Sequence, residues 1–120
     1  MAIVDNGLDR LKEHVTIIES KLVSWVSLAN GDSGSPVEYH TSADRSVQVV
    51  GTFGAGGTVV IEGSNDGTNY VTLTDPQANA LSFSSAGLEA ISELTRYIRP
   101  RVTGGDGTTS LSVYLIMRKS

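Results

Sequence analysis

The clearest strand pattern in the chain is Ser46-Val-Gln-Val-Val-Gly-Thr-Phe53. Val47, Val49 and Phe53 fall on one side of an extended chain, because successive side chains of a strand point to opposite faces. Gly54-Ala-Gly-Gly57 follows and interrupts the pattern. One apolar face followed by a glycine-rich turn indicates a strand that lies half-buried in a sheet.

Further runs of the same kind extend to the C-terminus. They are Thr58–Glu62, with apolar residues on both faces, and Tyr70–Thr74, Leu81–Phe83, Arg96–Thr103 and Leu111–Met117. Turn residues such as Asp66-Gly67 separate them. The chain is therefore predicted to be all-β, a single antiparallel β-sandwich or jelly roll of about seven or eight short strands.

The alternation also predicts which side chains enter the core. They are Val71, Leu73, Ile98, Val102, Leu111, Val113, Leu115 and Met117. Pro100 interrupts its run and cannot donate to a ladder hydrogen bond, which favours an edge strand or a bulge there.

Two segments have helical spacing. Leu88, Ile91 and Leu94 recur every three residues, so one short helical turn is expected near residues 86–94. Over residues 8–25 the apolar side chains follow the seam of an amphipathic helix, but the same stretch is rich in strand formers. Both interpretations stay open there. We favour an N-terminal arm at residues 1–13, either partly helical or irregular, and a β-sandwich domain at 14–120, with a long loop from Pro36 to Ala43.

Composition narrows the possible partners. The 120 residues suit one domain, cysteine is absent, and the formal net charge is −4. An acidic chain lacks the basic surface of a nucleic-acid binder. The first residues do not resemble a secretory signal, and no stretch approaches the roughly 20 apolar residues of a membrane span. We expect neither nucleic acid nor a membrane as partner.

The sequence offers little for catalysis. Its two histidines, His14 and His40, have no partner at metal-ligand spacing, and Ser33 has no base to activate it. The Asp-rich turns at Asp32, Asp66 and Asp106 are candidates for calcium, although Asp and Asn also favour turns for purely conformational reasons. We predict a protein that is not an enzyme and has no metal or cofactor.

Two surface features remain as candidate partner-binding sites. Tyr97, Arg99 and Arg101 alternate away from the core and would form a basic, partly aromatic stripe. Such residues are favoured at interfaces. The second feature is the apolar arm, represented by Ile3, Val4, Leu8 and Leu11. Because open strand edges and such an arm favour self-association, we also expect a dimer or trimer.

Five segments, at residues 28–34, 43–49, 51–54, 61–67 and 96–102, follow one another in a specific order and spacing. Through them most of the chain, from about residue 22 to 118, resembles small structural proteins of tailed bacteriophages. Within that group the chain is most similar to capsid decoration or cement proteins. The resemblance implies a jelly roll or sandwich that binds the major capsid protein at the capsid surface of the virion, after synthesis in the host bacterial cytoplasm.

Two other functions stay open. One is a structural protein of the tail, neck or fibre. The other comes from Glu62–Tyr70, which is similar to a strand-turn-strand of discoidin-type carbohydrate-binding domains. In that case Tyr70, Trp25 or Tyr39 would be the stacking platform for a sugar.

Overall fold

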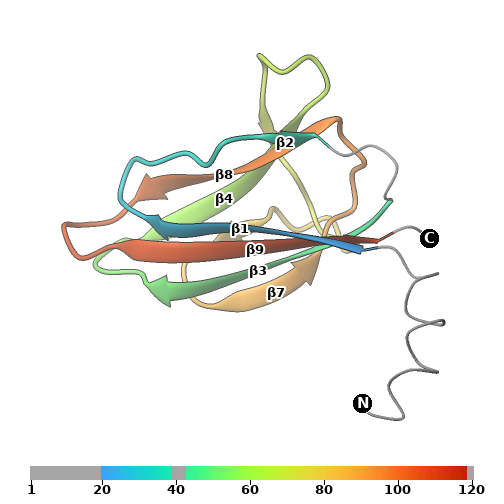
Figure 1. The fold of residues 1–120 in the computed structure, drawn as a ribbon. Coiled ribbons are helices and arrows are strands. Elements are labelled where there is room, and N and C mark those ends of the chain that lie inside the picture. The colour runs from blue at the N-terminus through green and yellow to red at the C-terminus, as the bar shows by residue number, and fades with distance from the viewer. Residues whose placement is uncertain (1–19, 39–42, 119–120) are drawn as a thin grey trace, which may run out of the picture.

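The computed structural model describes residues 20–38 and 43–118, whose regular structure is entirely β-strand (Figure 1). The strands are β1 (Ser20–Leu28), β2 (Val37–Glu38), β3 (Asp44–Thr52), β4 (Thr58–Ser64), β5 (Val71–Thr72), β6 (Ser82–Phe83), β7 (Gly87–Ala90), β8 (Tyr97–Gly104) and β9 (Ser110–Arg118).

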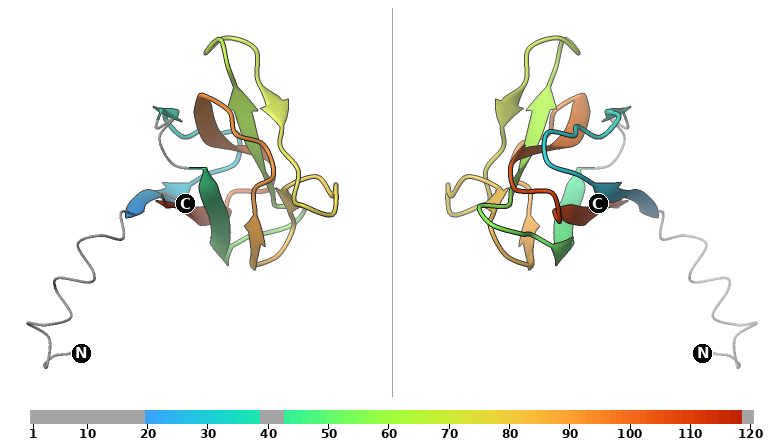
Figure 2. Two further views of the ribbon diagram at one scale, coloured as in Figure 1. Left: turned by 90° about the vertical axis from the view of Figure 1, so that its right-hand side faces the viewer. Right: turned by 90° about the vertical axis from the view of Figure 1, so that its left-hand side faces the viewer.

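These strands form two antiparallel sheets, which lie face to face (Figure 2). The four-stranded sheet has the order β1-β9-β3-β7. The five-stranded sheet has the order β2-β8-β4-β5, with β6 also paired to β4. The prediction of an antiparallel β-sandwich is confirmed.

The core fills the space between the sheets and follows the predicted alternation. Val47 and Val49 of β3 are buried, and Phe53 packs against them at the margin. On β9, Leu111, Val113, Leu115 and Met117 are each no more than 2% exposed. Ile98 and Val102 of β8 meet them from the other sheet. Because side chains along a strand point alternately to its two faces, every second residue of these strands lies in the core.

The central strand β4 is buried on both of its faces, as its composition predicts. Val59 and Ile61 point into the core, whereas Val60, Glu62 and Ser64 occupy the outer face and are also buried. Burial of the outer face needs side chains that reach over it from neighbouring strands. Those side chains form the first surface described below.

The predicted helical turn near residues 86–94 is wrong. Gly87–Ala90 is the edge strand β7, paired with Ser46–Val49 of β3. Leu88 and Leu94 are 63% and 56% exposed, and only Ile91 is buried. A stretch this short gains more from ladder hydrogen bonds to an open sheet edge than from one isolated helical turn.

At the N-terminal side, residues 20–28 form a strand, so the helical alternative is wrong for that part of 8–25. The arm at residues 1–13 lies outside the described residues.

Two smaller expectations also change. Val37–Glu38 pairs with β8 inside the predicted long loop, and Val71 is 64% exposed because β5 is at the margin of its sheet.

Pro100 lies where β8 has no second strand beside it. β2 reaches only Tyr97 and Ile98. The Pro100 carbonyl instead accepts a hydrogen bond from the Gly34 N–H over 2.9 Å. The missing N–H of Pro100 therefore faces a connecting segment and not a strand, which agrees with the predicted edge position.

Candidate interaction surfaces

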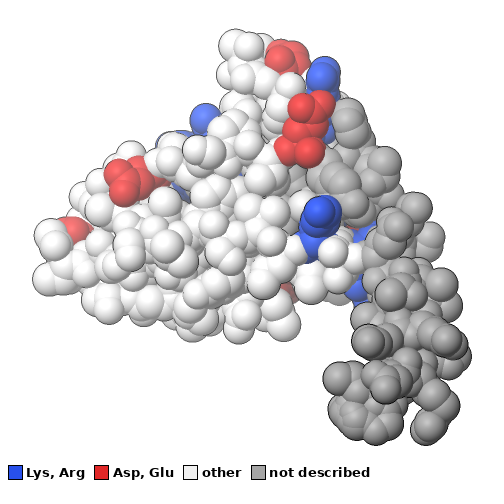
Figure 3. Space-filling model, in the orientation of Figure 1, with Lys and Arg blue, Asp and Glu red and all other residues white. Residues whose placement is uncertain are grey.

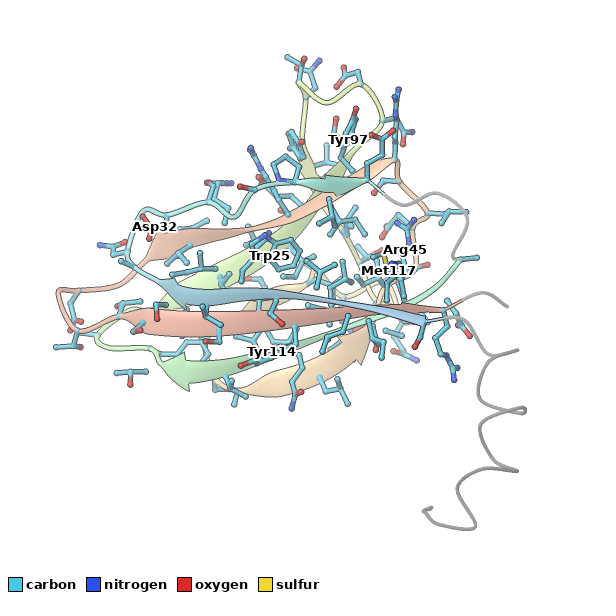
Figure 4. All side chains as sticks on the ribbon, in the orientation of Figure 1. Trp25, Asp32, Arg45, Tyr97, Tyr114 and Met117 are labelled. Atoms are coloured by element: carbon cyan, nitrogen blue, oxygen red, sulfur yellow. The ribbon has the colours of Figure 1, made fainter. Side chains whose placement is uncertain are left out.

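The first surface lies on the outer side of β8 and β4. Cross-strand pairing sets Arg99 opposite Glu62, and Tyr97 opposite Ser64. These side chains point outward because Ile98 and Val102, which alternate with them, are in the core. We call Tyr70, Glu62, Tyr97, Arg99 and Arg101 the arginine face. Tyr97 projects from this side of the sandwich in Figure 4.

Glu62 is the centre of the arginine face. Its Oε1 accepts from Arg99 Nε at 2.9 Å, and its Oε2 accepts from Arg101 Nε at 3.1 Å. The Glu62 side chain is only 4% exposed, whereas the two arginines are 27% and 45% exposed. A buried carboxylate is tolerated only when it is paired and hydrogen-bonded. The three charges sum to +1, so the face keeps a positive excess.

Two tyrosines hold the neighbouring guanidinium groups. The guanidinium carbon of Arg99 lies 3.8 Å from the centre of the Tyr70 ring. Arg96, which precedes β8, lies 5.2 Å from the Tyr97 ring and pairs with Glu38 at 2.7 Å. Cation–π contacts of this kind fix the plane of each guanidinium. The N–H groups of Arg99 that do not contact Glu62 are thereby held in defined directions.

The structure brings together three of the predicted site residues, namely Tyr97, Arg99 and Arg101. The other four, Ile3, Val4, Leu8 and Leu11, lie outside the described residues. Sequence reasoning missed Glu62 as the partner of the two arginines. The available signal was an acidic residue in an otherwise apolar run, because a charge in a doubly buried strand needs a cation opposite it.

The second surface is the outer side of the four-stranded sheet. Cross-strand pairing aligns its outward residues in rows. One row is Leu22, Ile116, Ser46 and Ala90; the next is Ser24, Tyr114, Gln48 and Leu88. At one end, Ser20, Arg118 and Asp44 form a further row. We call these three rows, together with Val26, Val50 and Ser112, the uncharged face.

The uncharged face gathers most of the exposed apolar side chains. Among the described residues six large hydrophobics are exposed, and four of them lie here, namely Leu22 at 64%, Val26 at 62%, Leu88 at 63% and Ile116 at 39%. Figure 3 shows the broad white area that these strands present. The only charged residues of this face, Arg118 and Asp44, pair with each other at 3.3 Å. Grouped apolar exposure marks an interaction site more strongly than single exposed residues do.

The Asp-rich turns use their carboxylates internally. Asp66 accepts hydrogen bonds from the backbone N–H groups of Thr68 and Asn69, from the Asn69 amide and from the Ser64 hydroxyl, all at 2.8 Å. Asp106 accepts from the backbone N–H groups of Ala55 and Thr108 at 2.9 Å. These hydrogen bonds, led by those from the Asn69 and Ala55 N–H groups, lower the pKa of each carboxyl.

Asp66 therefore caps its own loop as an Asx turn does, whereas Asp106 caps its own loop at Thr108 and also holds the turn at Ala55, which is 51 residues away in the sequence. Within residues 20–38 and 43–118, no three His, Cys, Asp or Glu residues gather as a metal site would require. In the same ranges, no helix has the length and apolar character needed to cross a membrane.

Two of the aromatic residues proposed to stack on a sugar, Tyr70 and Trp25, already contact other residues of the chain. One side of the Tyr70 ring carries Arg99. Trp25 packs against the core and its Nε1 donates to the Ser35 carbonyl at 2.9 Å. A Cβ added at Gly34 would lie 2.5 Å from the Trp25 ring, so the main chain covers that side of the indole. Tyr39 lies outside the described residues.

Comparison with known proteins identifies the fold but no family. No family model matches the chain, and no curated protein matches its sequence. Among solved structures, the chain is similar to the SPBc2 prophage-derived protein YomS, with a TM-score of 0.63 and 10% sequence identity. The match covers 83% of this chain and 95% of that one. At this identity the similarity shows that the two proteins share a fold.

Proposed function

We propose that this chain is a non-enzymatic structural protein of a tailed-bacteriophage virion, and that it binds the lattice of the major capsid protein and stabilises the head. The observation that carries the proposal is the likeness to a prophage-derived protein over nearly the whole of that protein. The resemblance of the sequence to capsid decoration proteins points in the same direction.

The arginine face is the proposed contact with the capsid. Arg101 is 45% exposed, and its Nε contacts Glu62 while its other N–H groups remain available as donors. Arg99 is held in place between Glu62 and Tyr70. Pre-oriented arginines beside tyrosines suit the recognition of a carboxylate-bearing protein surface, because each guanidinium can form two parallel hydrogen bonds with a carboxylate. An acidic loop of the capsid protein is the expected partner.

Lattice binding explains how so small a domain could stabilise a particle. A contact of standard size buries about 1,600 Å² in total. Many copies at capsomer junctions would add such contacts over the whole shell. A protein of this kind needs a rigid scaffold and a defined face, and does not need a catalytic cleft.

The test is co-sedimentation of the full chain with purified expanded capsids, combined with the temperature at which those capsids disrupt. We expect saturable binding and a higher disruption temperature. Arg101→Gln and Tyr97→Ala should each weaken binding at least about 10-fold, as central interface residues do. Lys21→Gln, on the other sheet, is the matched control for loss of a positive charge. A chain that neither sediments with capsids nor changes their disruption would refute the proposal.

A tail, neck or fibre position is the remaining alternative, since the fold likeness does not depend on the location within a particle. Electron cryo-microscopy of the virion distinguishes the two by the location and copy number of the protein. The carbohydrate-binding alternative is weaker, because Tyr70 and Trp25 are engaged within the chain.

A further inference from the structure

We propose that the uncharged face binds a second copy of this chain, and that the two copies are related by a two-fold axis that runs between β9 and β3 along the strands. This inference does not rest on the capsid function. It rests on the charge, the area and the pattern of side chains on that face.

Charge favours a second copy as the occupant. The chain carries a net charge of −4, so two copies repel each other over most orientations. The uncharged face has only Arg118 and Asp44, of opposite sign. Two identical chains can therefore approach through this face without bringing a net charge against a like charge. Its exposed leucines, valine and isoleucine supply the apolar area that such a contact buries.

The area is sufficient for a dimer. Strands β1, β3 and β9 each have nine residues and β7 has four. At about 3.3 Å per residue and about 4.8 Å between strands, the flat footprint is roughly 500 Å². Two such faces bury on the order of 1,000 Å², which is the lower limit for a specific interface and corresponds to a weak, reversible dimer.

The pattern of side chains selects the axis. A two-fold axis along the strands between β9 and β3 keeps each cross-strand row in place and exchanges β9 with β3 and β1 with β7. Ile116 then faces Ser46 of the second copy, because the two residues share a row. In the same way Tyr114 faces Gln48.

The outer strands follow the same rule. Leu22 shares its row with Ala90, and Leu88 shares its row with Ser24, so each leucine faces a small side chain of the second copy. In aligned sheets that pack face to face, large side chains of one sheet lie against small side chains of the other, so that the two layers interdigitate. In the end row, Arg118 of each copy faces Asp44 of the other, so the only two charges of the face are paired across the axis.

A perpendicular axis fits less well. It would keep each strand in place and exchange the rows. Ile116 would then face Tyr114, two large side chains in contact, while Ser46 would face Gln48. Arg118 would face Ser112 and lose any opposite charge across the interface. The arrangement of this one sheet thus favours a single dimer geometry.

The first test measures the oligomeric state of the full chain by sedimentation velocity over about 1–500 µM, the range that spans ordinary dimer affinities. We expect a dimer. Leu22→Asp and Leu88→Asp should each weaken it by at least about 100-fold, because each change removes a buried leucine at two symmetric places. Val71→Asp and Leu94→Asp are the matched controls, since those side chains are equally apolar and 64% and 56% exposed but lie elsewhere.

The second test measures the axis. The chain has no cysteine, so single cysteines can be introduced cleanly. A mixture of the Gln48→Cys and Tyr114→Cys chains, treated with a short bismaleimide, should give more cross-linked dimer than a mixture of Tyr114→Cys and Ile116→Cys. The reverse ratio would assign the perpendicular axis and overturn the proposed one.

Two other results would overturn the proposal itself. The first is a monomer throughout the concentration range, which would leave the face to residues 1–19 of the same chain or to another partner. The second is a dimer that Leu22→Asp and Leu88→Asp weaken no more than the control variants do.

Discussion

Glu62 and Arg99 lie directly opposite each other on β4 and β8, and Arg99 Nε donates to Glu62 Oε1 over 2.9 Å. The glutamate is nearly inaccessible, at 4% exposure, yet it lies on the outer side of the sheet. The arginines above it do two things at once. They neutralise a charge that would otherwise be costly to bury, and they present their remaining donors to solvent.

This arrangement predicts unequal roles for two arginines that look alike in the sequence. Arg99→Ala leaves the buried Glu62 with one cation, so we expect it to lower the free energy of unfolding by about 2–3 kcal/mol. Arg96→Ala is the matched control. Arg96 also pairs with a glutamate and stacks on a tyrosine, but it is 51% exposed. Because an exposed ion pair contributes little to stability, the loss of Arg96 should lower the free energy of unfolding clearly less than the loss of Arg99 does. Urea denaturation of both variants measures the difference, and equal losses would contradict the central role of Glu62.

A side chain added at Gly34 should clash with Trp25 and Pro100. An added Cβ would lie 2.5 Å from Trp25 Cδ1 and 2.8 Å from Pro100 Cδ. Gly34→Ala should therefore destabilise the protein by about 1–3 kcal/mol, as overpacking does. Gly107→Ala is the control, because nothing lies within 4 Å of its Cβ position. Thermal unfolding compares the two, and a Gly34→Ala variant as stable as Gly107→Ala would show that the Trp25 ring moves aside freely.

Substitutions at the adjacent residues Leu115 and Ile116 can test whether the side chains of β9 alternate between the core and the outer face. Leu115 is fully buried, whereas Ile116 is 39% exposed on the opposite side. Leu115→Ala should cost about 2–5 kcal/mol through the cavity that it leaves. Ile116→Ala should cost less than about 1 kcal/mol in the monomer. Denaturation at low protein concentration separates these effects from self-association, and a larger loss at Ile116 would mean that the register is shifted by one residue.

The turn at Asp66 predicts a dependence of stability on pH. The folded pKa of Asp66 lies below its usual value of about 3.9, mainly because the Asn69 backbone N–H donates to the carboxylate. A lowered folded pKa means that the contribution to stability is fully present above the unfolded pKa. It is lost as the pH falls through the folded value.

We therefore expect the difference in unfolding free energy between the wild type and Asp66→Ala to be constant above about pH 5 and to shrink below about pH 4. Urea denaturation from pH 7 to pH 2.5 measures it. Thr68→Ala keeps the backbone N–H that contacts Asp66 and should show no such change with pH. A difference that grew on acidification would contradict the lowered pKa.

The alternation in Ser46–Phe53 and in Leu111–Met117 was enough to predict the strands and their inward faces. The period of two belongs to the local geometry of an extended chain and needs no knowledge of partners. The same information predicted that Tyr97, Arg99 and Arg101 share the side away from the core. It could not predict that two of them meet Glu62, because that contact depends on the pairing of β8 with β4 over 37 residues.

At residues 86–94 a local pattern predicted the wrong structure. The spacing of Leu88, Ile91 and Leu94 fits a helical turn, but the open edge of β3 offers ladder hydrogen bonds, and Gly87–Ala90 pairs there. Val71 likewise follows the alternation and yet is exposed, because β5 is at the margin of its sheet. The fold class, the inner faces of the long strands and the turn chemistry follow from local patterns of residues, so they could be predicted without a structure. Which charges pair, and which apolar residues share one outer face, became known only from the folded chain, because both depend on strands that are distant in the chain and adjacent in space.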